Sequence, residues 1–190
     1  MICMSTSVIT KRLISQVEYH QMGDMGLLKP DEKVELINGE IYTLSPIGSR
    51  HRSIVLQLTT TFVPAFLGEF LISVQNSINL DQWNEPEPDV TILKNRADRY
   101  SGILLSPSDI LTVIEVSGTS YDFDLRIKLP LYASAGIAVL WIVNLNENRI
   151  EVYSEPRSTR YAKQIIYYPG DTISLHSKEF QVTDLLVMEI

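Results

Sequence analysis

Cysteine is nearly absent from this sequence, because Cys3 is the single one among 190 residues. An intrachain disulfide and a cysteine-based zinc site are therefore excluded. Long apolar runs are absent too: the longest strongly apolar stretch, residues 136–143, is far shorter than the roughly 20 residues that cross a bilayer as a helix. Residues 1–16 lack the continuous apolar core of a signal peptide. We therefore expect a cytoplasmic protein without a membrane segment.

An excess of positive charge is also missing. Lys and Arg total 16 against 23 Asp and Glu, so the formal net charge is −7. This balance excludes proteins that hold nucleic acid mainly through bulk positive charge. An enzyme that acts on nucleic acid is not excluded, because a site that holds metal ions is itself acidic.

No linker, repeat or low-complexity segment divides the chain, and its nine glycines and nine prolines are scattered. The hydrophobic share of 45% and the charged share of 21% are typical of a globular protein. A chain of this length buries roughly 70% of the surface that its unfolded form exposes. We therefore expect a single domain over residues 1–190.

Local patterns predict the first elements. Ser15 and Glu18 form a capping-box pattern at the start of a helix over residues 15–23. Asn38-Gly39 suits a type I′ turn, which predicts a hairpin of strands 33–37 and 40–44.

The rest of the chain alternates between helical and strand patterns. Ser49 is expected to cap a helix that Pro64 kinks or ends. Another helix is expected at 122–135, and strands at 71–80, 89–93, 110–116, 138–143, 149–153, 160–168 and 172–175. The strand–helix–strand order over 110–143 implies a parallel crossover. The fold class is therefore a mixed α/β or α+β sheet.

Four ionisable residues suggest chemistry. Glu115 lies inside a near-continuous apolar strand, where a carboxylate is costly unless it is paired or bound to metal. Asp89 opens the preceding strand, Glu35 lies in the first hairpin, and Lys128 lies on the following helix. If the strands of Asp89 and Glu115 are neighbours, two carboxylates and a backbone carbonyl can form an oxygen shell for Mg²⁺. A lysine beside such a shell would equip it for phosphodiester hydrolysis.

The same residues also fit structural roles. Asp89 can accept a hydrogen bond from a turn amide. Glu115 can form a buried ion pair with Lys128 or Arg126, and Asp124 with Lys128 can form an ordinary i,i+4 helix pair worth a few tenths of a kcal/mol. Spacing alone leaves both interpretations open.

Several segments resemble a known family. They are VELINGEIYTLSP (34–46), His51 at the next helix start, EPEPDVTIL (85–93) and LTVIEVSGTSYDFDLRIKLPLYASAGIAVLWIVNL (111–145). Over residues 34–153 the chain resembles the PD-(D/E)XK nuclease superfamily, and within it the Uma-two family of restriction-endonuclease-like proteins. The resemblance implies a central mixed sheet flanked by helices, with a core at about 33–153 and a β-rich C-terminal extension.

The resemblance also implies roles for individual residues. Asp89 and Glu115 would ligate Mg²⁺ or Mn²⁺ together with the carbonyl of Val116. Ser117 departs from the superfamily pattern, which usually has lysine there, and Lys128 on the helix would replace that lysine. Glu35 would contact a second metal or orient water, a task for which Gln75 is a weaker candidate. The implied activity is a metal-dependent DNA endonuclease, and the alternatives are a non-catalytic DNA-binding or interaction module and a purely structural protein.

Other residues carry weaker signals. His51 fits a helix start better than a catalytic base, and Trp83 and Trp141 fit packing. A homodimer is expected, since cutting two DNA strands suits two sites related by a two-fold axis. The surface expected to pair between chains holds Tyr161, Ile165, Ile166, Tyr167 and Tyr168. A separate, small basic cluster of Lys94, Arg96 and Arg99 is interpreted as a solvated loop.

Overall fold

The computed structural model describes residues 10–29, 31–44 and 48–186. Cys3 and residues 45–46 of the first family segment lie outside this range. The helices are α1 (Gln16–Asp24), α2 (Ser49–Ala65), α3 (Tyr121–Phe123), α4 (Leu129–Ser134) and α5 (Val182–Leu185), with a π-helical segment at Asp124–Lys128 and a 3₁₀ turn at Pro107–Asp109. The strands are β1 (Val34–Ile37), β2 (Glu40–Thr43), β3 (Phe70–Val74), β4 (Val90–Lys94), β5 (Ile110–Ser117), β6 (Val139–Asn144), β7 (Arg149–Arg157), β8 (Arg160–Tyr167), β9 (Thr172–Leu175) and β10 (Lys178–Gln181).

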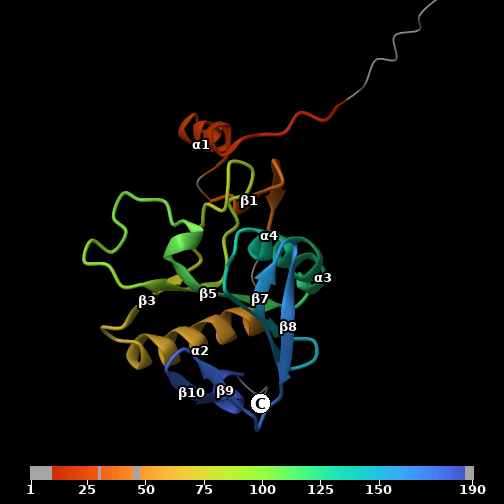
Figure 1. Cartoon of the computed structure of the whole chain (residues 1–190). Coiled ribbons are helices and arrows are strands. Elements are labelled where there is room, and N and C mark those ends of the chain that lie inside the picture. The colour runs from red at the N-terminus through yellow and green to blue at the C-terminus, as the bar shows by residue number, and fades with distance from the viewer. Residues whose placement is uncertain (1–9, 30, 45–47, 187–190) are drawn as a thin grey trace, which may run out of the picture.

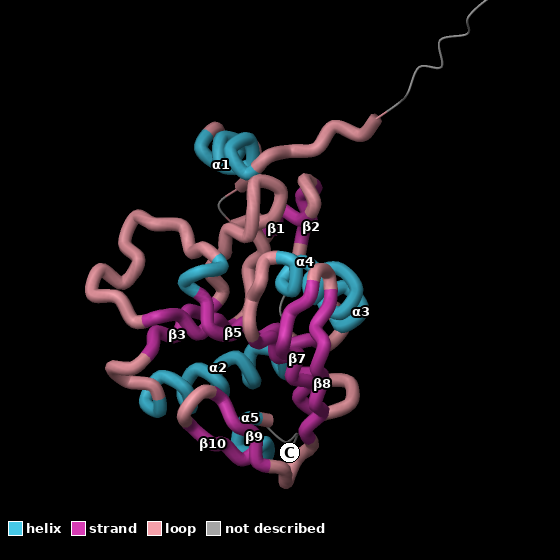
Figure 2. Tube along the Cα trace, viewed as in Figure 1, coloured by secondary structure: helices cyan, strands magenta, loops and turns pink. Residues whose placement is uncertain are grey.

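A six-stranded mixed sheet forms the centre of the molecule, in the order β3-β4-β5-β6-β7-β8 (Figure 1). The pair β5–β6 is parallel, and the other neighbouring pairs are antiparallel. The predicted crossover is confirmed, because the helical segments from α3 to α4 connect these two parallel strands. The hairpins β1–β2 and β9–β10 stand outside the sheet as separate two-stranded units (Figure 2).

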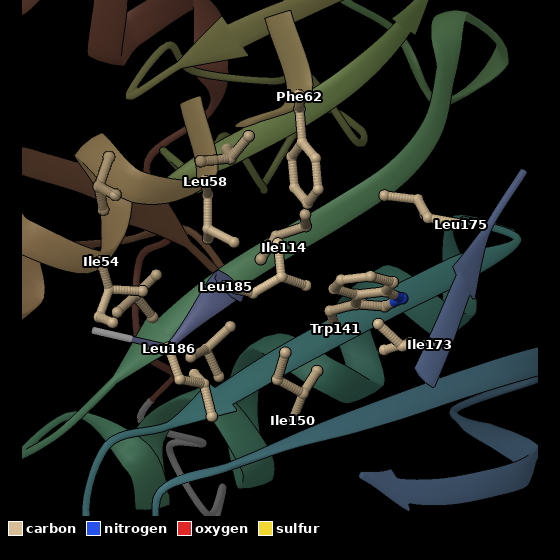
Figure 3. Close-up of a cluster of buried hydrophobic side chains, with 14 of the residues drawn as sticks. Ile54, Leu58, Phe62, Ile114, Trp141, Ile150, Ile173, Leu175, Leu185 and Leu186 are labelled. Atoms are coloured by element: carbon tan, nitrogen blue, oxygen red, sulfur yellow. The ribbon is translucent and has the colours of Figure 1, made fainter. Parts of the chain in front are cut away.

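Two hydrophobic clusters cover the two faces of the sheet. On one face α2, β9 and α5 pack on the sheet, where Phe62, Ile114 and Trp141 are fully buried (Figure 3). On the other face Tyr132 of α4 packs with Val113 and Ile142. The predicted packing role of Trp141 is thus confirmed.

Several sequence predictions need correction in detail. The capping box of α1 forms as predicted, but α2 is capped by Gly48, and Ser49 is its first helical residue. The strand expected at 71–80 ends at Val74, since the next residue, Gln75, adopts a φ of 50° that breaks the extended backbone.

The helix expected at 122–135 is divided. Its middle, Asp124–Lys128, is π-helical, and Pro130 follows at the start of α4. Proline has no backbone N–H and cannot donate to the carbonyl four residues before it. The wider π-helical turn before Pro130 therefore costs no hydrogen bond at the proline. Strand β4 begins one residue after Asp89, and β10 was not expected from the sequence pattern.

No helix in the part of the chain that the structure describes is both long enough and apolar enough to cross a membrane.

Candidate active site

A cavity of about 540 Å³ opens where the β1–β2 hairpin, the start of α2 and the end of β5 meet. Its lining includes Asp89, Glu115, Val116 and Lys128, which are four of the residues singled out in the sequence. Glu35 lies against this group as a fully buried side chain of β1. The five residues come from four separate segments of the chain, so only the fold brings them together.

Lys128 lies between two carboxylates. Its Nζ donates to Oε1 of Glu35 at 2.7 Å and to Oε1 of Glu115 at 3.2 Å. The hydroxyl of Tyr132 donates to the same Glu115 oxygen at 2.5 Å. All of these side chains are buried. The Glu115–Lys128 ion pair, which the sequence left open as a structural alternative, is therefore present. Glu35 forms a second ion pair with the same lysine.

The π-helical segment sets the position of Lys128. Asp124 and Lys128, at its two ends, are both buried. Oδ2 of Asp124 accepts hydrogen bonds from the hydroxyls of Ser117 and Ser120, each at 2.7 Å. Ser117, at the position where the superfamily usually has lysine, thus ties the end of β5 to the start of this segment.

Asp89 and Glu115 face the same side of the sheet. Strands β4 and β5 are antiparallel with Val90 opposite Ile114, so continuing this register by one residue puts Asp89 opposite Glu115. Both residues line the cavity. Their placement follows from the strand pairing and does not depend on a flexible loop.

Hydrogen bonds orient the Asp89 carboxylate. Oδ2 accepts from the backbone N–H of Val116 at 2.9 Å and lies 2.9 Å from Nε2 of His51. Oδ1 receives only a long bond of 3.4 Å from the Gln75 amide among the described residues. His51, which sequence reasoning treated as a helix-start residue, therefore directly contacts Asp89.

The carbonyl of Val116 lies on the same edge of β5 as its N–H, because both groups of one strand residue point to one side. The N–H is directed at Asp89. The ladder between β4 and β5 ends at Ile114, so β4 does not extend to Val116. The carbonyl is therefore directed toward the cavity end of this strand pair.

Burial shifts the ionisation of the group. Burial raises the pKa of Glu115 well above its usual range, although Lys128 partly opposes the shift. Burial by itself would lower the pKa of Lys128, but Glu115 and Glu35 raise it above its ordinary value. Burial also raises the pKa of Asp124. Lys128 thus stays charged, while Glu115 takes up a proton more readily than an exposed glutamate.

The donor set suits a hard cation only in part. Within residues 10–29, 31–44 and 48–186, no group of three or more His, Cys, Asp or Glu side chains is arranged to hold a metal ion. Asp89, Glu115 and Val116 nevertheless line one cavity, and Oε2 of Glu35 is buried without a hydrogen-bond partner among the described residues. Oxygen donors with spare acceptor capacity are the ligands that Mg²⁺ prefers, so the residues fit a site completed by a carbonyl and water.

Other predicted residues lie elsewhere. Arg126 is exposed and pairs loosely with Asp122 at 3.9 Å, so it is not the counter-ion of Glu115. Arg96 pairs with Asp98 in a surface loop, and neither it nor Lys94 lines the cavity. Tyr132 was missed because its hydroxyl could be assigned to Glu115 only after the helix was placed.

Comparisons with known proteins identify the family. Residues 17–184 match the model of the Uma2, or Uma-two, family, which is described as "Putative restriction endonuclease". The chain belongs to the Uma2 family. The predicted family resemblance is therefore confirmed.

A solved structure of similar fold is that of a "putative nuclease belonging to DUF820" from Anabaena variabilis ATCC 29413. The two structures superpose with a TM-score of 0.69 over 91% of this chain and 97% of the other, at 12% sequence identity. This likeness confirms the predicted fold class for the Uma2 chain, a mixed sheet flanked by helices. A comparison with curated proteins finds no match.

Proposed function

We propose that this Uma2 protein is a Mg²⁺-dependent endonuclease that hydrolyses DNA phosphodiester bonds. One observation carries the proposal: a buried Glu35–Lys128–Glu115 group and the carboxylate of Asp89 meet at one cavity, at the end of two paired strands. The family description as restriction endonucleases supports the same reaction, and enzymes of this type generally use divalent metals.

Asp89, Glu115 and the Val116 carbonyl would hold the metal, Mg²⁺ or Mn²⁺. When bound there, the ion would supply Lewis-acid stabilisation of phosphate oxygens and a more acidic water. The Val116 amide and His51 hold Oδ2 of Asp89, which leaves Oδ1 for a ligand in the cavity. Both described hydrogen bonds to Glu115 use Oε1, which leaves Oε2 for the same purpose.

Lys128 would supply a fixed positive charge beside the reacting phosphate. Its ammonium is buried and held by two carboxylates, so it needs no rearrangement to act on charge that develops during the reaction. Glu35 would keep Lys128 aimed at the cavity while Glu115 binds metal. Glu35 is thus a positioning residue for Lys128, with a direct metal contact as its second role.

The amino end of α2 offers a further contact for phosphate. Gly48, Arg50 and His51 line the cavity. The first turn of α2 contains no acidic residue, and the partial positive charge of a helix amino terminus favours anions. This contact is compatible with DNA as substrate, despite the negative net charge of the chain. The proposed location of the protein is the cytoplasm.

A homodimer is part of the proposal. Strand β8 is an edge of the sheet. Ile165 and Ile166 on this strand and Tyr168 directly after it expose 36%, 37% and 50% of their surface. Tyr161 and Tyr167 are instead partly buried against the two hydrophobic clusters. An edge strand with exposed apolar side chains can pair with a second copy, and light scattering that shows a monomer at micromolar concentration would remove the dimer.

The direct test is cleavage of a supercoiled plasmid and of circular single-stranded DNA, with Mg²⁺ or Mn²⁺. We expect Asp89→Ala to lower cleavage by at least about 10²-fold, the scale for loss of one preorganised electrostatic group. Arg126→Ala, which changes an exposed side chain away from the cavity, is the matched control. Equal cleavage by wild type and Asp89→Ala would reject this site, and no cleavage with either metal would favour a non-catalytic module.

A further inference from the structure

An aromatic pair forms one wall of the candidate active-site cavity. Tyr42 of β2 and Phe123 of α3 both line it, and their ring centroids lie 5.2 Å apart with the planes inclined at 53°. Both side chains are only partly buried. In the described chain neither ring belongs to the two hydrophobic clusters that hold the fold together. The pair is thus a rim feature, and the core does not depend on it.

Strand register places Tyr42 on the side of the hairpin that carries the reaction machinery. Tyr42 pairs directly with Glu35 across β1 and β2, and directly paired residues share one face. Phe123 immediately precedes Asp124 at the start of the π-helical segment, which ends at Lys128. The aromatic wall is therefore attached to the same two elements that position Glu35 and Lys128.

The cavity lining combines two kinds of chemistry. The two rings, Leu44 and Leu145 are apolar or aromatic. Charged side chains, among them Asp89, Glu115 and Lys128, also line the cavity. A nucleotide has the same combination, with an aromatic base at one end and a charged phosphate at the other, and about 540 Å³ lies within the range of small-molecule sites.

The charge of the chain indicates where binding energy must come from. The net charge of −7 disfavours binding of an extended phosphate backbone, because binding of a DNA duplex relies on many lysine and arginine contacts. Stacking of bases on aromatic rings does not need that charge and contributes about 1–3 kcal/mol per base. A base inside a duplex is stacked on its neighbours and cannot reach a ring in a cavity wall, whereas an unpaired base can.

The geometry points to a base-stacking subsite at Tyr42 and Phe123, which makes DNA with unpaired nucleotides at the cleavage position the substrate class of this site. This inference rests on the proposed nuclease function for the reaction, but the stacking itself does not. The rings hold a base, and the adjoining phosphate reaches the part of the cavity that contains Asp89, Glu115 and Lys128.

The test measures binding of two fluorescein-labelled probes, a single-stranded DNA oligonucleotide and its duplex. Binding is measured by the fluorescence anisotropy of the probe, with Ca²⁺ in place of Mg²⁺. Tyr42→Leu and Phe123→Leu keep apolar volume but remove a stacking face. We expect each to weaken single-strand binding by about 5- to 150-fold, the equivalent of ~1–3 kcal/mol, and to leave duplex binding unchanged. Tyr42→Phe retains the ring and loses only a hydroxyl that lies 3.4 Å from Glu40, so it should bind like wild type.

Thermal melting of each variant separates stacking from packing. Leucine variants that melt near wild type and lose single-strand affinity support the subsite. Variants that lose affinity only in proportion to lost stability, variants that weaken both probes equally, or variants that bind normally would overturn it.

Cleavage of the same two unlabelled substrates distinguishes this inference from the proposed function. Ring-dependent binding without cleavage of any substrate would reject the nuclease and keep the subsite. Cleavage of duplex and single strand at equal rates, with no effect of either leucine variant, would reject the subsite and keep the nuclease.

Discussion

Two buried glutamates on the central sheet have opposite surroundings. Glu151 of β7 is 1% exposed and Glu115 of β5 is 3% exposed. Glu151 accepts hydrogen bonds on both carboxylate oxygens, from side chains of five residues. They are Tyr121, Asn144, Arg149, Tyr153 and Gln164. Glu115 receives hydrogen bonds from Lys128 and Tyr132, and both reach the same oxygen.

The difference is visible in their ionisation. Burial would raise the pKa of Glu151, but the surrounding donors lower it below the usual value. The pKa of Glu115 is raised by burial, and the cation that opposes this shift, Lys128, also pairs with Glu35. A buried carboxylate with a complete set of donors holds the fold together, whereas one with acceptor capacity left over is suited to a ligand.

The largest effect is expected for Lys128→Met, which removes the cation from the Glu115 group. Two buried carboxylates would lose their counter-ion, so the free energy of unfolding should fall by about 3–5 kcal/mol in metal-free urea titrations. Cleavage should also fall by about 10²-fold or more. Added Mg²⁺ should restore part of the stability. A variant that melts and cuts like wild type would contradict both roles.

The next largest effect is expected for Glu151→Gln, which breaks the donor-rich cluster. One glutamine oxygen cannot replace two carboxylate oxygens, so buried donors are left unsatisfied at a cost of about 1–3 kcal/mol. Urea unfolding should show this loss at neutral pH, while the Mg²⁺-induced rise in melting temperature should be unchanged. If that rise also disappeared, the two clusters would not be independent.

A smaller effect on stability is expected for Glu115→Gln. The variant removes a carboxylate that burial disfavours, keeps an acceptor for Tyr132, and leaves Lys128 paired with Glu35. Its metal-free stability should lie within about 1 kcal/mol of wild type, on the scale of a single hydrogen bond. The Mg²⁺-induced rise in melting temperature should be lost. A destabilisation as large as that of Lys128→Met would instead identify Glu115 as purely structural.

The smallest effect concerns pH, and its sign differs between the clusters. Glu115 has a raised pKa in the folded state, so its contribution to stability is present below the unfolded pKa and is lost as pH rises. Glu151 has a lowered pKa, so its contribution is present above the unfolded pKa and is lost as pH falls. Metal-free unfolding measured on both sides of the usual glutamate pKa of about 4.3 should therefore show two changes: Glu115→Gln removes a loss of stability as pH rises above that value, and Glu151→Gln removes a loss of stability as pH falls below it. Parallel curves would contradict the contrast.

Sequence patterns predicted the order of the main elements from α1 to β9 and the parallel crossover, because apolar periodicity and β-branched runs are local properties. They also indicated Glu115, since a carboxylate in an apolar strand is conspicuous without any structure. The donor set of Glu151 was not predicted, because its partners lie on β6, β7, β8 and α3 and converge only in the sheet.

Other features depend on backbone geometry that periodicity does not carry. The positive φ of Gln75 ends β3 early, and a π-helical turn has the same residue composition as an α-helical one. The contact of His51 with Asp89 joins residues 38 positions apart, so no local signal could assign it. The residues alone left Lys128 and Arg126 open as partners of Glu115, and only the structure shows that Lys128 makes the contact.

Two side-chain contacts between β5 and the following helical segment fix the length of that segment. Glu115 and Ser117 are two residues apart on the strand, a span of roughly 6.6 Å, and they contact Lys128 and Asp124, which stand at the two ends of the π-helical segment. Both contacts form at once, so the length of this segment matches the spacing on the strand. Removing one residue between Asp124 and Lys128 would break this match, whereas an extra residue in the turn at 118–120 would change neither span. Insertions and deletions in this part of the chain should therefore be tolerated in the turn and excluded from the helical segment.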